Sequence, residues 1–330
     1  MYASIQKVIS VEPIENADAI EKVKVLGWQV VCKKGQFKTG DLVIFISIDT
    51  VLPSDNPAFS FLEKNHYRIK TIKLKQTLSQ GICFPMSILP EGEWKEGDDV
   101  AEILHIQHYI KPVPGGLAGE NKGNFPSFLH KSNEERLQNF PDVLKELEYL
   151  PYYITVKVDG SSGTFYYKDG VFGVCSRNLE KKETEGNYFW KVAKKYDMEK
   201  KLQAFGKNIA LQGEVCGPGI QKNHLNLPDT DVFIFNIYDI DDGRYMNMAE
   251  VSTYCHQWGI PMVPIEEINP YFTYTSVESL LEKAKGKYPG TNNNREGIVV
   301  RPMLEKYSQV MKGRMSFKIV NNEYLLKEEE

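Results

Sequence analysis

Lys157 is the residue of this chain that is best placed to react. It ends an apolar run that begins at Tyr153, and Asp159 and the turn-forming Gly160 follow almost at once. An amine held at the rim of a sheet can act as a nucleophile, because burial and nearby cations lower its pKa. A Lys-x-Asp-Gly string is short, however, and taken alone it most often marks a surface hairpin with a solvated lysine. The functional interpretation therefore depends on companion residues downstream.

The companions are charged residues that follow or end later apolar runs. They stand in Ser176-Arg-Asn178, Leu211-Gln-Gly-Glu214, Arg295-Glu-Gly-Ile-Val-Val-Arg301 and Met315-Ser-Phe-Lys318. Phosphoryl transfer depends mostly on positioning and on cancelling spread-out negative charge, which arginine and lysine can do. Carboxylates have a different task, because they can hold a hydrated divalent cation through its water ligands. The residue types together suit phosphoryl transfer to or from a lysine.

Length, charge and cysteine pattern indicate an ordinary protein of two domains. A chain of 330 residues is long for a single core, and its net charge of −4 gives no general attraction to polyanions. Contact with nucleic acid must therefore come from local patches. The sequence shows no signal peptide and no apolar run long enough to span a membrane, which predicts a cytoplasmic protein. The five scattered cysteines predict buried free thiols, and we expect a monomer.

Residues 1–110 read as short strands separated by turns, which predicts an OB-type β-barrel. The expected strands cover residues 4–11, 20–26, 28–32, 41–48, 67–74, 81–84 and 100–106. Four cations lie on or next to one of these strands: Arg68, Lys70, Lys73 and Lys75. They suit contact with a phosphate backbone, but lysines also protect an exposed edge strand against aggregation, and both interpretations stay open.

Residues 111–131 are rich in Pro and Gly, which predicts a linker, and residues 132–330 form the expected second domain. Ser132-Asn-Glu-Glu135 has the form of a capping box and predicts a helix that starts there. Further helices are expected over residues 187–205, 248–258 and 277–287, between strands at 153–156, 164–167, 171–176, 209–215, 231–238, 297–301 and 316–320. This mixture predicts an α+β domain of antiparallel sheets with peripheral helices.

The order and spacing of the charged runs resemble those of a known superfamily. The runs around Lys157, Arg177, Glu214, Phe235, Glu296 and Lys318 are similar to motifs I, Ia, III, IIIa, IV and V of the covalent nucleotidyltransferases, which include ATP-dependent DNA and RNA ligases and mRNA capping enzymes. Arg136-Leu-Gln-Asn139, Gly217-Pro-Gly-Ile-Gln221 and the N-terminal barrel narrow the resemblance to the RNA ligase 5 family, the Deinococcus nick-sealing type, over essentially the whole chain.

The resemblance implies an OB module in front of a nucleotidyltransferase (adenylation) domain that uses ATP and a divalent metal. Lys157 would attack the α-phosphorus of ATP, expel pyrophosphate and hold AMP as a phosphoramidate. AMP would then pass to a 5′-phosphate, from which a 3′-OH would displace it. The implied partner is a nicked duplex with RNA at the 3′-OH end, the implied role is RNA repair, and no membrane is involved.

The resemblance also implies a role for each matched residue. Three carboxylates would hold hydrated Mg²⁺ or Mn²⁺: Asp159, Glu214 and Glu296. Four cations would cancel phosphate charge, and the first would orient pyrophosphate: Arg136, Arg177, Lys312 and Lys318. Glu214 and Arg177 would also touch the ribose. Val156 and Phe235 would line the nucleotide site, where Phe235 stacks on adenine unless it is an ordinary core residue.

Two departures from the superfamily pattern bear on the interpretation. DNA ligases and capping enzymes carry another OB domain after motif V, whereas this chain ends at Glu330, soon after Lys318. Motif V is Lys-x-Lys in many relatives, but Val320 takes the second position here. Three functions stay open: an ATP-dependent RNA ligase, a DNA ligase or capping guanylyltransferase, and a nucleic-acid-binding relative without catalysis. The retained lysine and carboxylates favour the first.

Overall fold

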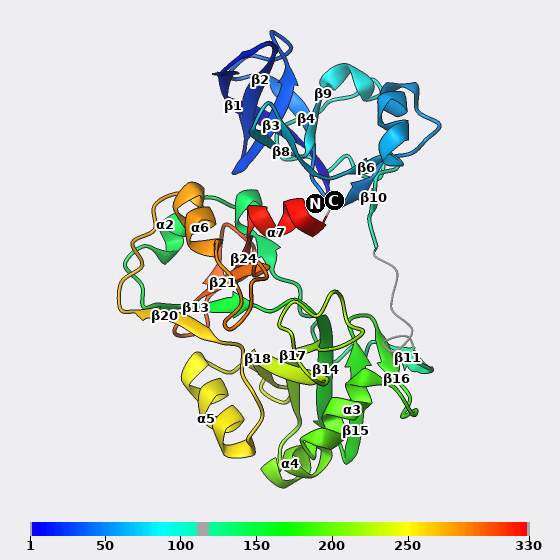
Figure 1. The fold of residues 1–330 in the computed structure, drawn as a ribbon, viewed down its shortest axis with the longest axis vertical. Helices are drawn as coiled ribbons and strands as arrows, with labels where there is room; N and C mark the ends of the chain where they lie inside the picture. Colours follow the sequence, from blue (N-terminus) through cyan, green and yellow to red (C-terminus); the bar gives the residue numbers. More distant parts are fainter. Residues whose placement is uncertain (1, 111–118, 329–330) are drawn as a thin grey trace. The chain divides into compact units, whose positions relative to one another are not determined.

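The computed structural model describes residues 2–110 and 119–328, which divide into two compact units (Figure 1). The first unit comprises residues 2–110, 137–141 and 325–328, and the second comprises residues 119–136 and 142–324. Hydrogen bonds hold the short segment 137–141 in the first unit. The Gly27 N–H donates to the Gln138 carbonyl (2.9 Å), and Trp28 Nε1–H donates to Asn139 Oδ1 (2.9 Å). A Cβ at Gly27 would lie 2.7 Å from Gln138 Cα, so this close approach requires glycine.

The first unit is built on a curled antiparallel sheet in the order β3-β2-β1-β4-β9. The strands are β1 (Ala3–Ile14), β2 (Ala17–Val25), β3 (Trp28–Lys33), β4 (Leu42–Ile46) and β9 (Ile82–Pro85). The N-terminal part of β1 pairs with β4 and its C-terminal part pairs with β2, and register shifts after Val8 and Pro13 bend it. Trp28, Val30 and Cys32 are buried at alternate positions of β3, so one face of the sheet carries the core.

Shorter elements complete the first unit: β5 (Thr50–Val51), η1 (Pro57–Asn65), β6 (Arg68–Ile69), β7 (Thr71–Leu74), β8 (Thr77–Gln80), η2 (Met86–Ile88) and β10 (Gln107–His108). The strand expected over residues 67–74 is divided, because β6 pairs with β5 whereas β7 pairs with β8. The strand expected over residues 100–106 is wrong. These residues form turns, and their apolar pattern reflects the burial of Val100, Leu104 and Ile106 there.

The second unit contains two large sheets. Their strand orders are β11-β16-β15-β14-β17-β18-β19 and β12-β24-β21-β13-β20. The seven-stranded sheet consists of β11 (Asn121–Asn124), β14 (Ser161–Lys168), β15 (Val171–Ser176), β16 (Leu179–Lys181), β17 (Ile209–Cys216), β18 (Asp231–Asp239) and β19 (Arg244–Tyr245). The five-stranded sheet consists of β12 (Glu135–Arg136), β13 (Tyr152–Lys157), β20 (Ile265–Asn269), β21 (Gly297–Pro302) and β24 (Phe317–Val320). A separate hairpin pairs β22 (Tyr307–Ser308) with β23 (Gly313–Arg314).

Helices cover one face of the seven-stranded sheet (Figure 1). α3 (Tyr188–Lys195), α4 (Met198–Phe205) and α5 (Met248–Trp258) bury their apolar sides against it. Because side chains alternate along a strand, β17 turns Leu211 and Val215 toward this core and Glu214 toward the opposite, polar face. The remaining helices are η3 (Leu137–Asn139), α2 (Val143–Leu147), α6 (Val277–Ala284) and α7 (Asn322–Glu328). The predicted α+β fold class is confirmed.

Two helix predictions differ from the structure. No helix begins at the expected capping box, because its polar groups serve tertiary contacts: Ser132 Oγ lies 2.6 Å from Ser162 Oγ, and Glu134 forms an ion pair with the buried Arg301 (2.8 Å). The chain instead enters the five-stranded sheet as β12, parallel to β24. The helix expected over residues 187–205 is interrupted at Asp197, whose φ of 50° places it in the left-handed region.

The expected linker is only partly described. Residues 111–118 lie outside the described residues, and the part that follows belongs to the second unit, where β11 pairs with β16. All five cysteines are buried and free, as predicted. Among residues 2–110 and 119–328, no helix is both long enough and apolar enough to cross a membrane.

Candidate active site

Lys157 lies at the end of β13, which is the fourth strand of the five-stranded sheet and has β21 and β20 as its neighbours. The ladder between β13 and β21 ends with Lys157 opposite Gly297, which brings Glu296 next to the lysine. Gly297 has φ of 152°, and a Cβ there would lie 2.1 Å from the Ile319 carbonyl oxygen. Glycine at this position therefore lets β24 approach β21 closely.

Lys157 forms an ion pair with Glu296, with 2.8 Å between Nζ and Oε2 and only 22% and 18% of the two side chains exposed. Burial lowers the pKa of Lys157, but the carboxylates of Glu296, Glu214 and Asp159 outweigh burial and raise its pKa above the ordinary value. The expectation of a lowered pKa is thus wrong for this arrangement, because the nearest groups are anions. The resting lysine is an ammonium ion with a carboxylate as its nearest proton acceptor.

The three carboxylates are crowded on one side of the lysine. Burial is the main cause that raises the pKa of Glu214, to about 8, and the charges of Glu296 and Asp159 add to it against the opposing effect of Lys157. Like charges gathered in this way favour a cation between them. In the described part of the chain, no three His, Cys, Asp or Glu side chains converge closely enough to bind an ion directly. The crowded carboxylates of Asp159, Glu214 and Glu296 suit a hydrated cation held through its water ligands, as magnesium prefers.

A cluster of cations lies on the neighbouring strands. Lys318 on β24 stands opposite Arg136 on one side and Val299 on the other. The pKa of Lys318 is lowered to about 8, mainly by burial and in addition by the positive charges of Arg136 and Lys157. Arg177 follows the end of β15, and its Nη2 donates to Asn133 Oδ1 (3.1 Å). Repulsion among these cations would be relieved by an anion, which makes this side of the site suitable for phosphate groups.

Phe235 lies where β18 carries one residue more than its partner strand. The register between β17 and β18 shifts between Gln212 and Gly213, so that Phe235 has no direct partner. Its half-buried ring packs against the cluster of Val158, Cys216 and Val263. Val156 is buried on β13, and its N–H donates to the Pro264 carbonyl (2.9 Å). An apolar surface suited to a nucleobase thus adjoins the lysine, although the ring packing alone also fits a core residue.

The remaining predicted residues lie elsewhere. Lys312 is exposed in the β22–β23 turn, with φ of 51°. In the first unit, Arg68 is held by Tyr109, whose ring centre lies 3.7 Å from its Cζ, and by Asp49 at 3.8 Å. Lys73 and Lys75 are exposed on the β7–β8 hairpin, and Lys70 is half-buried. The four cations of the first unit therefore do not share a single strand.

His224 contacts the site but was not identified from the sequence. Its Nδ1 lies 2.7 Å from Asp159 Oδ2, and Asn293 Nδ2 donates to the His224 carbonyl (2.8 Å). The histidine follows the Gly217-Pro-Gly-Ile-Gln221 run in a loop without periodicity, so only the three-dimensional contact reveals it. A side chain that contacts a carboxylate in this way fixes its orientation, which a metal-holding carboxylate requires.

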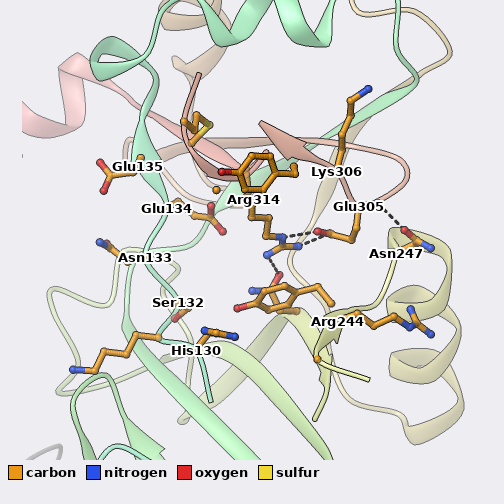
Figure 2. A pocket seen from close by; sticks show the side chains of 18 of the residues that line it. His130, Ser132, Asn133, Glu134, Glu135, Arg244, Asn247, Glu305, Lys306 and Arg314 are labelled. Carbon is orange, nitrogen blue, oxygen red and sulfur yellow. Dashed lines mark hydrogen bonds and ion pairs between the residues drawn. The ribbon is translucent and has the colours of Figure 1, made fainter. Parts of the chain in front are cut away.

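A cavity of about 1040 Å³, lined mostly by polar and charged residues, lies in the second unit (Figure 2). Figure 2 shows Arg314 pointing into its centre, where it forms a bidentate pair with Glu305 and donates to Asn236 Oδ1 (2.9 Å). The segment from His130 to Glu135 forms one wall. Ser132 and Asn133 of this wall contact Ser162 and Arg177, so the cavity and the lysine site share one chain segment.

Comparisons with known proteins cover both units. A family model described as RNA ligase matches residues 150–320, and a model described as an OB-fold domain matches residues 2–86. The second match agrees with the barrel predicted for the N-terminal residues. A search of curated proteins found no match.

Solved structures of Naegleria gruberi RNA ligase are similar to the chain over its whole length. A variant with ATP and manganese is 36% identical with a TM-score of 0.93, and the match covers 100% of both chains. The structure with pyrophosphate is 36% identical with a TM-score of 0.92, over 99% of this chain and 98% of the other. A variant with AMP and manganese is 36% identical with a TM-score of 0.92, over 99% of this chain and 98% of the other.

Proposed function

The chain belongs to the RNA ligase family, and from this premise we propose that it is an ATP-dependent enzyme that charges Lys157 with AMP. We further propose that it seals 3′-OH/5′-phosphate nicks in duplex nucleic acid whose 3′-OH strand ends in RNA, as a step of RNA repair. The observation that carries the proposal is the ion pair of Lys157 with Glu296, which lies beside a group of cations that includes Lys318.

The geometry supports the first step as follows. Lys157 attacks the α-phosphorus of ATP as the free amine, a form that a divalent cation near the carboxylates would favour, and Glu296, whose Oε2 lies 2.8 Å from Nζ, holds the amine in place. A P–N bond forms, and the bond from the α-phosphorus to the bridging oxygen breaks, so that pyrophosphate leaves with the electron pair. Lys318 and Arg136 cancel the charge that develops on the phosphate oxygens.

The later steps use the same residues. The 5′-phosphate of the nick attacks the lysine-bound AMP, and the P–N electrons return to Lys157. A 3′-OH then attacks the activated 5′-phosphate, and AMP leaves. Asp159, Glu214 and Glu296 would hold a Mg²⁺ or Mn²⁺ ion, which supplies positive charge that offsets the triphosphate. Structures of the Naegleria ligase with ATP, AMP, manganese and pyrophosphate support this choice of donor, metal and leaving group.

Incubation with labelled nucleotide tests the charging step. Wild-type protein, α-labelled ATP and Mn²⁺ should give a labelled band that survives denaturing electrophoresis. Lys157→Ala should give none, because no other residue supplies the attacking amine. Label from GTP instead of ATP would indicate a capping activity, and a Lys157→Ala protein that still takes label would contradict the assignment of the nucleophile.

A set of synthetic nicks tests the substrate. Each duplex carries RNA or DNA at the 3′-OH side and at the 5′-phosphate side, in the four possible combinations. Sealing should require RNA at the 3′-OH end and tolerate either sugar at the other end. Equal sealing of nicks that contain only DNA would favour a DNA ligase.

A further inference from the structure

Tyr288 places its hydroxyl group among backbone atoms of the reactive residues. It lies between α6 and β21, outside every motif identified from the sequence. Its hydroxyl donates to the Lys157 carbonyl (2.9 Å) and accepts from the Asp159 N–H (3.0 Å). It also accepts from the Glu296 N–H (3.1 Å). One side-chain oxygen thus links the main chains of Lys157, Asp159 and Glu296, which are the proposed nucleophile and two of the proposed metal-holding residues.

These three bonds use the full capacity of a tyrosine hydroxyl, which has one donor and two acceptor positions. Tyr288 is only 2% exposed, so water has little access to replace the bonds. Ordinary sheet pairing does not extend this far, because the β13–β21 ladder ends where Lys157 faces Gly297. Beyond that point, the hydroxyl links the Asp159 and Glu296 main chains across a gap that strand hydrogen bonds do not span.

The segment that carries Tyr288 also holds the Asp159 side chain. The Tyr288 N–H donates to the Asn293 carbonyl (3.1 Å), and Asn293 Nδ2 donates to the His224 carbonyl (2.8 Å). His224 Nδ1 in turn lies 2.7 Å from Asp159 Oδ2. Residues 288–296 therefore hold Asp159 twice, at its backbone through Tyr288 and at its carboxylate through His224.

We infer that Tyr288 is a positioning residue for lysyl-AMP formation: its hydroxyl fixes the separation and orientation of Lys157, Asp159 and Glu296. The inference rests on the proposed function of Lys157. Its physical basis is that the amine and the carboxylates come from strands far apart in sequence, and nucleophilic attack loses rate steeply when such groups are misplaced. Tyr288 itself does not touch the reacting atoms.

Tyr288→Phe in the full chain tests the inference, because it removes the hydroxyl and keeps the ring. The rate of lysyl-AMP formation per folded molecule, measured in a single turnover with α-labelled ATP and saturating Mn²⁺, should fall about 10- to 100-fold. Binding of Mn²⁺ alone, followed by the electron paramagnetic resonance signal of the free ion, should weaken by a similar factor. This second measurement does not depend on activity.

Tyr196→Phe is the matched control. Its hydroxyl donates to Asp231 Oδ1 (2.6 Å) beside the helix-covered core, away from the lysine. It also removes a tyrosine hydroxyl that bonds to an aspartate of the same unit, and it should leave both the rate and Mn²⁺ binding unchanged. Wild-type rate and Mn²⁺ affinity in Tyr288→Phe would overturn the inference, and so would a variant that fails to fold, because the hydroxyl would then support the whole unit. If wild-type protein takes no label, the proposed function fails, and Mn²⁺ binding still decides the role of Tyr288.

Discussion

At the residue scale, the site is a balance between anions around Lys157 and cations around Lys318. The carboxylates raise the pKa of Lys157, while burial and neighbouring positive charge lower the pKa of Lys318 to about 8. Each half is unfavourable by itself: the carboxylates repel one another, and the cations do the same. Binding of a divalent cation to one half and of phosphate groups to the other would relieve both, so the free protein stores in this site part of the energy that favours its substrates.

Lys318→Met should stabilise the free protein in a pH-dependent way. The folded pKa of Lys318 is about 8, against an ordinary value of 10.5, so between these pH values the unfolded chain binds more protons and wild-type stability rises with pH. Below pH 8 the variant should be the more stable by up to roughly 3 kcal/mol. Its advantage should shrink as the pH approaches 10.5. Urea unfolding of both proteins at pH 7 and pH 10 measures this, and an advantage that is constant with pH would contradict the lowered pKa.

At the scale of elements, the site depends on how closely β21 approaches β24. Gly297 is the point of contact, because the Ile319 carbonyl lies where its Cβ would be. Glu296 immediately precedes β21, and Lys318 lies within β24 opposite Val299, so the packing of these two strands sets the distance between the anionic and the cationic half. Both the stability of the fold and the geometry of the site therefore depend on the glycine at position 297.

Gly297→Ala should therefore impair both properties together. The 2.1 Å overlap with a carbonyl oxygen has to be relieved by moving β21 away from β24, at a cost of roughly 2–4 kcal/mol in the free energy of unfolding. Lysyl-AMP formation should fall even under conditions in which the variant is fully folded. Gly313→Ala is the control, because the nearest atom to its Cβ is 3.9 Å away. Equal stability of the two variants would show that the strands adjust without cost.

At the scale of the whole molecule, we propose that the two units carry separable tasks. Every residue proposed for the charging chemistry lies in the second unit, whereas the first unit contains the OB-fold match and exposed lysines on the β7–β8 hairpin. An overall charge of −4 gives no general attraction to nucleic acid, so local cations of this kind have to supply it. Charging and sealing should accordingly respond to different substitutions.

The double variant Lys73→Glu, Lys75→Glu should charge itself with AMP at the wild-type rate. Its sealing of a nicked duplex should fall about tenfold and become less sensitive to salt, because contacts to phosphates are lost. Lys34→Glu with Lys38→Glu is the control, since these exposed lysines of the same unit change the net charge equally. Equal sealing by both double variants would leave the two lysines as protection of an exposed edge rather than contacts to nucleic acid.

The sequence by itself determined the α+β class, the OB-type N-terminal strands and the charged residues at strand ends, because these depend on patterns between near neighbours in the chain. Only the tertiary structure decided that Glu296 is the partner of Lys157, that Lys157 is an ammonium among anions, and that Tyr288 and His224 hold the site. It also showed that no helix starts at the expected capping box. Glu134 forms an ion pair with Arg301, and the next residues form β12. These features depend on contacts between segments from 65 to more than 160 residues apart in the chain, and local sequence patterns carry no information about such contacts.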